Sequence, residues 1–190
     1  MRILCRLKIQ GQEYIPPEGG LIVASNHVAG ADPFLLGSTI DRELWFMAKK
    51  ELLKPFILGR LLTKLNAFPV DRFGFDIDVI KKSILFLKQG KALIMFPEGT
   101  RSSDGRVMEG KIGVGMLACK AETPIVPAYI ENTKRAWWNF LLGKKMKISF
   151  GRIIDSEWIK SCGKSKTGYK IVTDELMKRI RELQDNAQNT

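Results

Sequence analysis

The sequence predicts a single-domain α/β fold in which helices flank one sheet, and three observations carry this prediction. Short apolar runs of strand length alternate along the chain with stretches whose apolar residues recur at helical spacing. The chain has 190 residues, a length usual for one domain, and 45% of them are hydrophobic, which is enough to bury a sizeable core. No internal repeat, low-complexity tract or linker interrupts it. We therefore expect residues 1–190 to form one domain.

The predicted elements follow one another in a regular order. After a turn at 16–20, Leu21–Ser25 is an apolar run that suits a buried strand. Asp32 and Pro33 then suit the cap and the first position of a helix over 34–38. Since open α/β sheets commonly bind ligands at the ends of their strands, we expect functional side chains in the loops there. Further strands are expected at 44–48, 67–70, 92–96, 125–130 and 146–150, and further helices at 55–65, 76–89, 112–121 and 172–183.

The charge of the chain indicates an anionic partner. Lysine and arginine number 31 against 20 acidic residues, and the net charge of +11 favours a phosphorylated substrate, an anionic membrane or another polyanion. The basic residues are scattered, and the sequence has no zinc-ligand spacing, Lys/Arg block or RNA-binding aromatic signature. We therefore favour a lipid partner over nucleic acid.

Cysteine usage and hydropathy indicate a cytoplasmic protein. Cys5, Cys119 and Cys162 are odd in number and far apart, which argues against a disulfide framework and against thiolate metal sites. Met1 to Gln10 lacks the apolar stretch of a signal peptide, and no later run is long enough to span a bilayer. We expect any membrane contact to be peripheral, and we expect neither a metal site nor a resident cofactor. Cys119, inside a predicted apolar helix, is interpreted as a buried structural residue.

His27 is the only histidine, and its ordinary pKa of about 6.5 suits general-base chemistry near neutral pH. Asp32 lies five residues further on. In a continuous helix the two side chains would be about 140° apart, but a loop containing Gly30 lets the carboxylate reach the imidazole and orient it. Two interpretations stay open on the local sequence, because a lone histidine is more often a hydrogen-bonding residue and Asp32 also suits a helix cap.

Charged residues follow three other predicted strands. In the segment 96–102, Arg101 can bind a phosphate through two parallel hydrogen bonds, and Gly99 lets main-chain amides approach an anion. The segment 68–72 leads in the same way into an aspartate and an arginine, and 48–52 adds a basic site. Each segment alone is more typical of a solvated surface turn than of a ligand site.

Four motifs occur together and in order: NHVAGADP at 26–33, FPVDR at 68–72, FPEGTRS at 96–102 and IVPA at 125–128. With these motifs the chain resembles the bacterial 1-acyl-glycerol-3-phosphate acyltransferases of the glycerolipid acyltransferase superfamily, from about Ile9 to Ile154. The resemblance implies a glycerol-3-phosphate acyltransferase-like α/β fold, a single domain with a mixed sheet flanked by helices.

The resemblance also assigns roles to residues. It implies that His27 and Asp32 are the catalytic pair, and that Lys49 shares in binding the phosphate, although Lys50 next to it makes this assignment ambiguous. The remaining residues that the resemblance places at the substrate are Arg72, Glu98, Gly99, Thr100 and Arg101 for the glycerol phosphate, and Ile125, Val126, Pro127 and Ala128 for the acyl pocket.

From the resemblance we expect the chain to move an acyl group from acyl-CoA or acyl carrier protein to the sn-2 hydroxyl of lysophosphatidate, giving phosphatidate. No serine or cysteine lies in a nucleophile motif, which favours direct attack over an acyl-enzyme. Three alternatives stay open: an acyltransferase for another lysophospholipid, glycerol 3-phosphate or an amino lipid; a non-catalytic basic lipid-binding module; and a nucleic-acid-binding protein.

A membrane contact is expected on the inner face of the cell membrane, against anionic lipid. Many relatives begin with a hydrophobic or amphipathic helix, whereas this chain starts almost at the first strand. The segment 137–145 combines aromatic, aliphatic and lysine side chains, as an interfacial contact does, and it is equally compatible with a packed core that has a basic end. The segment 52–65 is the second candidate.

Overall fold

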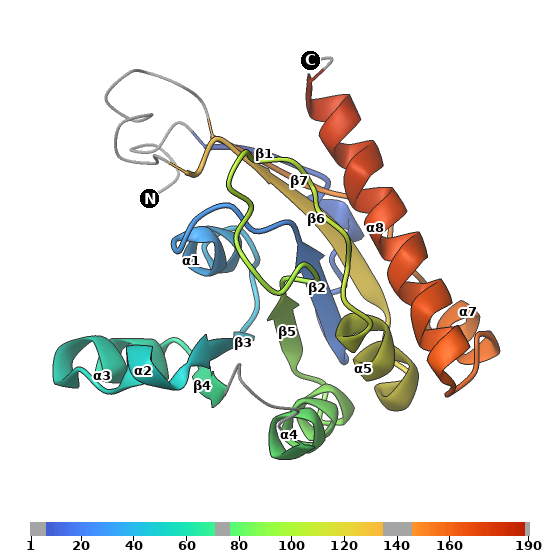
Figure 1. The fold of residues 1–190 in the computed structure, drawn as a ribbon, viewed down its shortest axis with the longest axis horizontal. Helices are drawn as coiled ribbons and strands as arrows, with labels where there is room; N and C mark the ends of the chain where they lie inside the picture. Colours follow the sequence, from blue (N-terminus) through green and yellow to red (C-terminus); the bar gives the residue numbers. More distant parts are fainter. Residues whose placement is uncertain (1–6, 71–76, 135–145, 189–190) are drawn as a thin grey trace.

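The computed structural model describes residues 7–70, 77–134 and 146–188. Within these ranges seven strands form one sheet in the order β1-β7-β6-β2-β5-β3-β4 (Figure 1). Strands β2, β3, β4, β5 and β6 run parallel to one another, β7 is antiparallel to β6, and β1 is parallel to β7. The expected mixed sheet is therefore confirmed. The strands are β1 (Leu7–Gln10), β2 (Leu21–Ser25), β3 (Leu44–Lys49), β4 (Ala67–Val70), β5 (Ala92–Met95), β6 (Ile125–Glu131) and β7 (Met146–Phe150).

Helices cover both faces of the sheet. The first helices pack on one face, where buried residues of α1 and α3 join a core with alternate residues of the strands. The later helices α4, α5, α7 and α8 pack on the opposite face (Figure 1). The helices are α1 (Asp32–Gly37), α2 (Lys50–Leu53), α3 (Phe56–Lys64), α4 (Ile77–Lys88), α5 (Gly113–Ala121), α7 (Ser156–Ser161) and α8 (Lys166–Gln188), with a 3₁₀ turn η1 (Gln12–Tyr14).

Strand β2 lies at the centre of the sheet, between β5 and β6, and every residue in it is buried. Ile22 and Ala24 face one hydrophobic cluster, and Leu21 and Val23 face the other. A strand covered on both faces needs a continuous apolar run rather than an alternating one, and for this reason its position is readable from the sequence. Because β2 is buried, the residue that follows it, Asn26, is held at the carboxyl end of this central strand.

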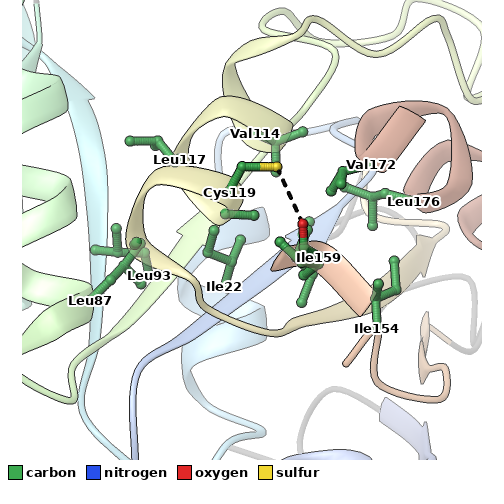
Figure 2. Close-up of a cluster of buried hydrophobic side chains, with 14 of the residues drawn as sticks. Ile22, Leu87, Leu93, Val114, Leu117, Cys119, Ile154, Ile159, Val172 and Leu176 are labelled. Carbon is green, nitrogen blue, oxygen red and sulfur yellow. Dashed lines mark hydrogen bonds between the residues drawn. The ribbon is translucent and has the colours of Figure 1, made fainter. Parts of the chain in front are cut away.

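Figure 2 shows the cluster under α5 and α8, where Cys119 lies among aliphatic side chains. Its Sγ lies 3.9 Å from the carbonyl oxygen of Ile159, and burial raises the pKa of the thiol to about 11. The thiol is therefore protonated near neutral pH. This agrees with the interpretation of Cys119 as a structural residue.

Several elements differ from those expected. β1 and α7 were not predicted, and α8 is longer at both ends than the expected 172–183. β1 is a short edge strand of half-exposed and exposed residues whose stability comes from pairing with β7, so its own pattern is weak. Along the described ranges, no helix combines the length and the apolar character needed to cross a bilayer.

Candidate active site

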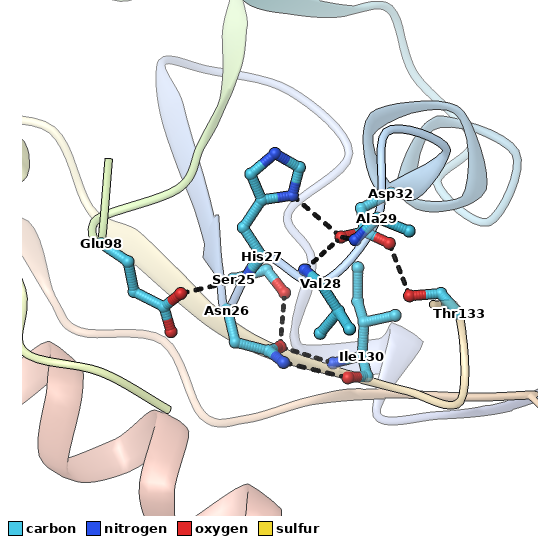
Figure 3. A network of polar contacts seen from close by, with 9 residues as sticks. All are labelled: Ser25, Asn26, His27, Val28, Ala29, Asp32, Glu98, Ile130 and Thr133. Atoms are coloured by element: carbon cyan, nitrogen blue, oxygen red, sulfur yellow. Dashed lines mark hydrogen bonds and ion pairs between the residues drawn. The ribbon is translucent and has the colours of Figure 1, made fainter. Parts of the chain in front are cut away.

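The site is built on loops that leave the carboxyl ends of parallel strands. His27 follows β2, Glu98 follows β5, and Thr133 follows β6. Because these three strands are neighbours in the sheet and point the same way, residues more than a hundred positions apart in the sequence meet at one edge (Figure 3).

His27 and Asp32 form a direct contact, with Nδ1 of the imidazole 2.9 Å from Oδ2 of the carboxylate. Asp32 is fully buried, and His27 is 8% exposed. An ionised carboxylate only accepts hydrogen bonds, so Nδ1 is the donor in this contact, and in a neutral imidazole Nε2 then carries the lone pair. This is the tautomer that a general base requires.

The Asp32 carboxylate also shapes the loop that carries His27. Its Oδ2 accepts hydrogen bonds from the backbone N–H groups of Val28 at 2.7 Å and Ala29 at 2.8 Å. The cap position of α1 is Ala31, and no side chain caps this helix end. The interpretation of Asp32 as a helix cap is therefore wrong, because its oxygens bind groups before the helix rather than in its first turn.

Thr133 was missed by sequence reasoning. Its Oγ1 donates a hydrogen bond to Oδ1 of Asp32 at 2.7 Å, and the hydroxyl is buried. Both carboxylate oxygens are thereby engaged, so Asp32 has little freedom to rotate away from His27. A hydroxyl just beyond a predicted strand is the only signal in the sequence, and it is too common to single out one residue.

Asn26 ties the loop that carries His27 to β6. Its Oδ1 accepts from the N–H of Ile130 at 2.8 Å, and its Nδ2 donates to the carbonyl of the same residue at 3.0 Å. Ser25 Oγ donates to Asn26 Oδ1 at 3.2 Å. The amide continues the strand pairing where β2 ends, and in this way it fixes the backbone on which His27 sits. Sequence reasoning assigned no role to this residue.

The segment 96–102 supports His27 from another side. The imidazole is stacked on Phe96, with ring centroids 4.0 Å apart and an interplanar angle of 21°. The backbone N–H of Ser102 donates to the carbonyl of His27 at 2.7 Å. At Gly99 the backbone has φ +70°, and a Cβ there would lie 2.9 Å from Nζ of Lys111. Glycine is therefore needed at this turn.

Glu98 points into the protein and is 2% exposed. Its Oε2 accepts from the N–H of His27 at 3.4 Å, and its Oε1 accepts from the N–H of Met108 at 3.1 Å. These contacts give Glu98 a supporting role, and a direct contact with glycerol phosphate stays a prediction. Burial raises the pKa of the carboxyl, while the two backbone hydrogen bonds and the nearby His27 oppose that rise.

Because the pKa of Glu98 is raised, its contribution to the free energy of unfolding should decrease as the pH rises. Between the ordinary glutamate pKa of about 4.3 and the higher native value, the folded state binds more protons than the unfolded chain. The stability that the Glu98 carboxyl contributes is fully present at a pH below the ordinary glutamate pKa, and it is lost as the pH rises through the native pKa. In urea unfolding, we expect the free energy of unfolding of the wild type, minus that of Glu98→Gln, to decrease across this interval. A difference that increases with pH would contradict the assignment.

His27 lines a pocket of about 470 Å³. Its polar lining consists of His27, Lys49 and Arg101, and the rest is mainly apolar: Gly30, Pro33, Phe34, Phe46, Met47, Ala48, Leu52, Leu58, Leu62 and Phe96. A second cavity of about 460 Å³ shares Pro33, Phe34 and Phe46 with the first. The combination of two cations, one imidazole and a long apolar surface suits an anionic amphiphile.

Lys49, the last residue of β3, and Lys50, which follows it, line different cavities. Lys49 lines the pocket with His27 and is partly buried, whereas Lys50 opens α2 and lines a different cavity. Arg101 approaches the loop between His27 and Asp32, since a Cβ added at Gly30 would lie 3.9 Å from its Nη1. His27, Lys49 and Arg101 therefore line the same pocket.

Other predicted site residues lie elsewhere. Thr100 is exposed and does not line the pocket. Ile125, Val126, Pro127 and Ala128 belong to β6, at the centre of the sheet, and none of them lines the pocket with His27. An acyl contact from these four stays a prediction. Arg72 and the segment 137–145 lie outside the described residues.

The comparisons with known proteins agree with this geometry. A family model described as Acyltransferase matches residues 6–131. The chain belongs to this acyltransferase family. A 1-acyl-sn-glycerol-3-phosphate acyltransferase from Bacillus subtilis (strain 168) is 32% identical over 180 residues, which cover 94% of this chain and 88% of that protein. A protein of the same name from Limnanthes douglasii is 35% identical over 134 residues, which cover 69% of this chain but only 47% of the plant protein.

A solved structure supports the fold of this acyltransferase. The crystal structure of the 1-acyl-sn-glycerophosphate (LPA) acyltransferase PlsC from Thermotoga maritima matches with a TM-score of 0.72 and 27% identity, over 94% of this chain and 72% of that one. The resemblance predicted from the four motifs is thus confirmed for family and fold. Among the residues that the structure describes, no group of three or more His, Cys, Asp and Glu side chains is placed to hold a metal ion.

Proposed function

We propose that this acyltransferase moves a fatty acyl group from a thioester donor to the sn-2 hydroxyl of lysophosphatidate, forming phosphatidate. The observation that carries the proposal is the His27–Asp32 pair in a pocket that also presents Lys49, Arg101 and an apolar lining. Relatives named 1-acyl-sn-glycerol-3-phosphate acyltransferase support this choice of acceptor.

In the proposed reaction His27 acts as the general base. Its Nε2 takes the proton of the acceptor hydroxyl while the hydroxyl oxygen attacks the thioester carbonyl. The C–S bond then breaks, and the departing thiolate takes the proton from Nε2, so that His27 returns to its starting state. Proton transfer of this kind typically contributes about 10²- to 10⁴-fold to the rate.

Asp32 acts through His27. Its carboxylate holds the proton of the imidazole on Nδ1 and stabilises the imidazolium that forms during attack. Thr133 and the N–H groups of Val28 and Ala29 hold the carboxylate in this orientation. Asp32 and Thr133 are therefore positioning residues in the proposed mechanism.

Lys49 and Arg101 are proposed to bind the acceptor phosphate, with Arg72 as a further predicted contact. Hydrogen bonds between cations and phosphate oxygens are among the strong ones in proteins, and they would hold the hydroxyl near Nε2. The apolar residues of the pocket, such as Phe34 and Phe46, suit the hydrocarbon part of the substrate.

The donor is proposed to be acyl-CoA or acyl carrier protein, both of which are anionic thioesters that suit a chain with net charge +11. The thioester serves as co-substrate, and the proposed steps need neither a metal nor a resident cofactor. Because the acceptor is a membrane lipid, we propose that the enzyme works as a peripheral protein on the cytoplasmic face of the membrane.

A panel assay tests the proposed function. The purified protein is offered acyl-CoA and acyl-carrier-protein donors with lysophosphatidate, other lysophospholipids, glycerol 3-phosphate and an amino lipid, and the products are identified by mass spectrometry. The proposal expects phosphatidate as the main product. Preferential acylation of another acceptor would replace lysophosphatidate in the proposal.

The phosphate role of Lys49 leads to a separate prediction. In Lys49→Met, we expect the KM for lysophosphatidate to rise at least about tenfold, because a charge-assisted hydrogen bond worth roughly 1.5–3 kcal/mol is lost, while kcat changes less. With the acceptor dispersed in solution, Lys50→Met is the matched control, since Lys50 does not line this pocket. An unchanged KM in Lys49→Met, measured by steady-state kinetics, would remove Lys49 from the phosphate site.

A further inference from the structure

An apolar surface lies on the hairpin formed by α2 and α3. Of the eleven exposed large apolar side chains in the part of the chain that the structure describes, six belong to this hairpin and its end. Phe56 is 74% exposed and Ile57 is 83% exposed. We call these six side chains the hairpin patch: Leu52, Phe56, Ile57, Leu58, Leu61 and Leu65.

The hairpin patch follows the periodicity of α3. Ile57, Leu61 and Leu65 recur every four residues and therefore share one side of the helix. Gly59 and Leu62 are the buried residues of α3. A surface helix normally presents polar residues to water on the side away from the core, so an apolar stripe there indicates a contact with a partner.

Basic residues accompany the hairpin patch. The segment 50–64 contains Lys50, Lys54, Arg60 and Lys64 against a single acid, Glu51. The guanidinium of Arg60 lies over the ring of Phe56, with its Cζ 4.9 Å from the ring centroid. Apolar side chains bordered by cations complement the acyl region and the anionic headgroups of a bilayer, whereas a second copy of this chain would bring like charges together.

The hairpin patch is continuous with the site. Leu52 and Leu58 belong both to the patch and to the lining of the pocket that holds His27. Lys49, which lines the same pocket, directly precedes α2. In Figure 1 the hairpin lies beyond the β3–β4 end of the sheet, away from α8.

We propose that the hairpin patch inserts into the headgroup region of an anionic bilayer and that the lipid acceptor enters the pocket from the leaflet past Leu52 and Leu58. The inference rests on the proposed function, because a lipid acceptor is what makes entry from the leaflet useful. The basic residues of the hairpin lie at the level of the headgroups, and the apolar stripe of α3 contacts the acyl chains.

The double variant Phe56→Glu, Ile57→Glu tests this proposal. Both side chains are exposed, neither lines the pocket, and acidic residues in the first turn of a helix suit its dipole, so the variant should fold. Binding is measured by sedimentation with vesicles of phosphatidylcholine and phosphatidylglycerol. We expect the partition coefficient to fall at least about tenfold, since burying one side chain of this size is worth more than a factor of ten.

Ile171→Glu on α8 is the matched control, because Ile171 is also exposed but lies on a helix that packs on the opposite face of the sheet. This variant should bind vesicles as the wild type does. Wild-type binding by the double variant would overturn the proposal. A wild-type dimer that the double variant converts to a monomer would also overturn it, because a second copy would then cover the patch.

Activity measurements separate this proposal from the proposed function. With a short-chain lysophosphatidate dispersed below its aggregation concentration, the double variant should match the wild type, whereas with acceptor embedded in vesicles its rate should fall. Equal rates on embedded acceptor would contradict entry from the leaflet. If the wild type acylated neither the dispersed nor the embedded acceptor, the proposed function would fail, while vesicle binding would still decide whether the hairpin patch contacts lipid.

Discussion

Replacing His27 by asparagine should lower kcat by at least about 10²- to 10⁴-fold, which is the contribution typical of general acid–base catalysis. The amide nitrogen of asparagine can take the place of Nδ1 and still donate to Asp32, so the loop keeps its contacts. The substitution removes the lone pair of Nε2, the only base that the proposed mechanism uses. Steady-state rates with a saturating donor measure the effect.

Circular dichroism and thermal unfolding of His27→Asn provide the control, because loss of the stacked contact with Phe96 could also loosen the loop. A variant that folds like the wild type and is inactive supports the role of His27. If a folded variant kept the wild-type kcat, the general base would have to be another group, and the mechanism proposed above would be wrong.

Replacing Asp32 by asparagine should have the second-largest effect, a fall in kcat of up to about 10⁴-fold with little change in KM, as expected when a base loses the carboxylate that orients it. An asparagine oxygen can still accept from Val28 and Ala29, and its amide can donate to Thr133. The loop is therefore kept, while the negative charge that stabilises the imidazolium is lost.

Thr133→Val is the matched comparison for Asp32→Asn. It removes the hydrogen bond to Oδ1 but leaves the charge and the contact between Oδ2 and His27. We expect a smaller loss of kcat than in Asp32→Asn. Equal losses in the two variants, measured in the same steady-state assay, would show that orientation rather than charge is the contribution of Asp32.

The strands of the central sheet could be predicted because burial on both faces demands continuous apolar runs. Leu21–Ser25 and Ile125–Glu131 meet this demand, and both are in the structure as β2 and β6. The strand order and the antiparallel direction of β7 were not predictable, because they depend on which distant segments pack together. β1 was missed for the same reason.

In the site, local sequence reasoning singled out His27 and Asp32 but not the residues that hold them in place. The loop between His27 and Asp32 is short, so their contact was one of two interpretations available from the spacing. Thr133 is 101 residues from Asp32 in the sequence, and Asn26 binds a backbone 104 residues away. Contacts between residues so far apart in the sequence arise because β2 and β6 are neighbours in the sheet. The resemblance placed Glu98 at the glycerol phosphate. In the structure, both of its carboxylate oxygens accept hydrogen bonds from backbone N–H groups.

Formation of phosphatidate is the decisive measurement for the proposed role of His27. Matched preparations of wild type and His27→Asn are incubated with lysophosphatidate and a long-chain acyl thioester, and the products are quantified by mass spectrometry over time. We expect phosphatidate from the wild type, and from the variant at most about a hundredth of that rate. Phosphatidate at the wild-type rate from the folded variant, or no phosphatidate from the wild type with either class of donor, would contradict the proposed mechanism.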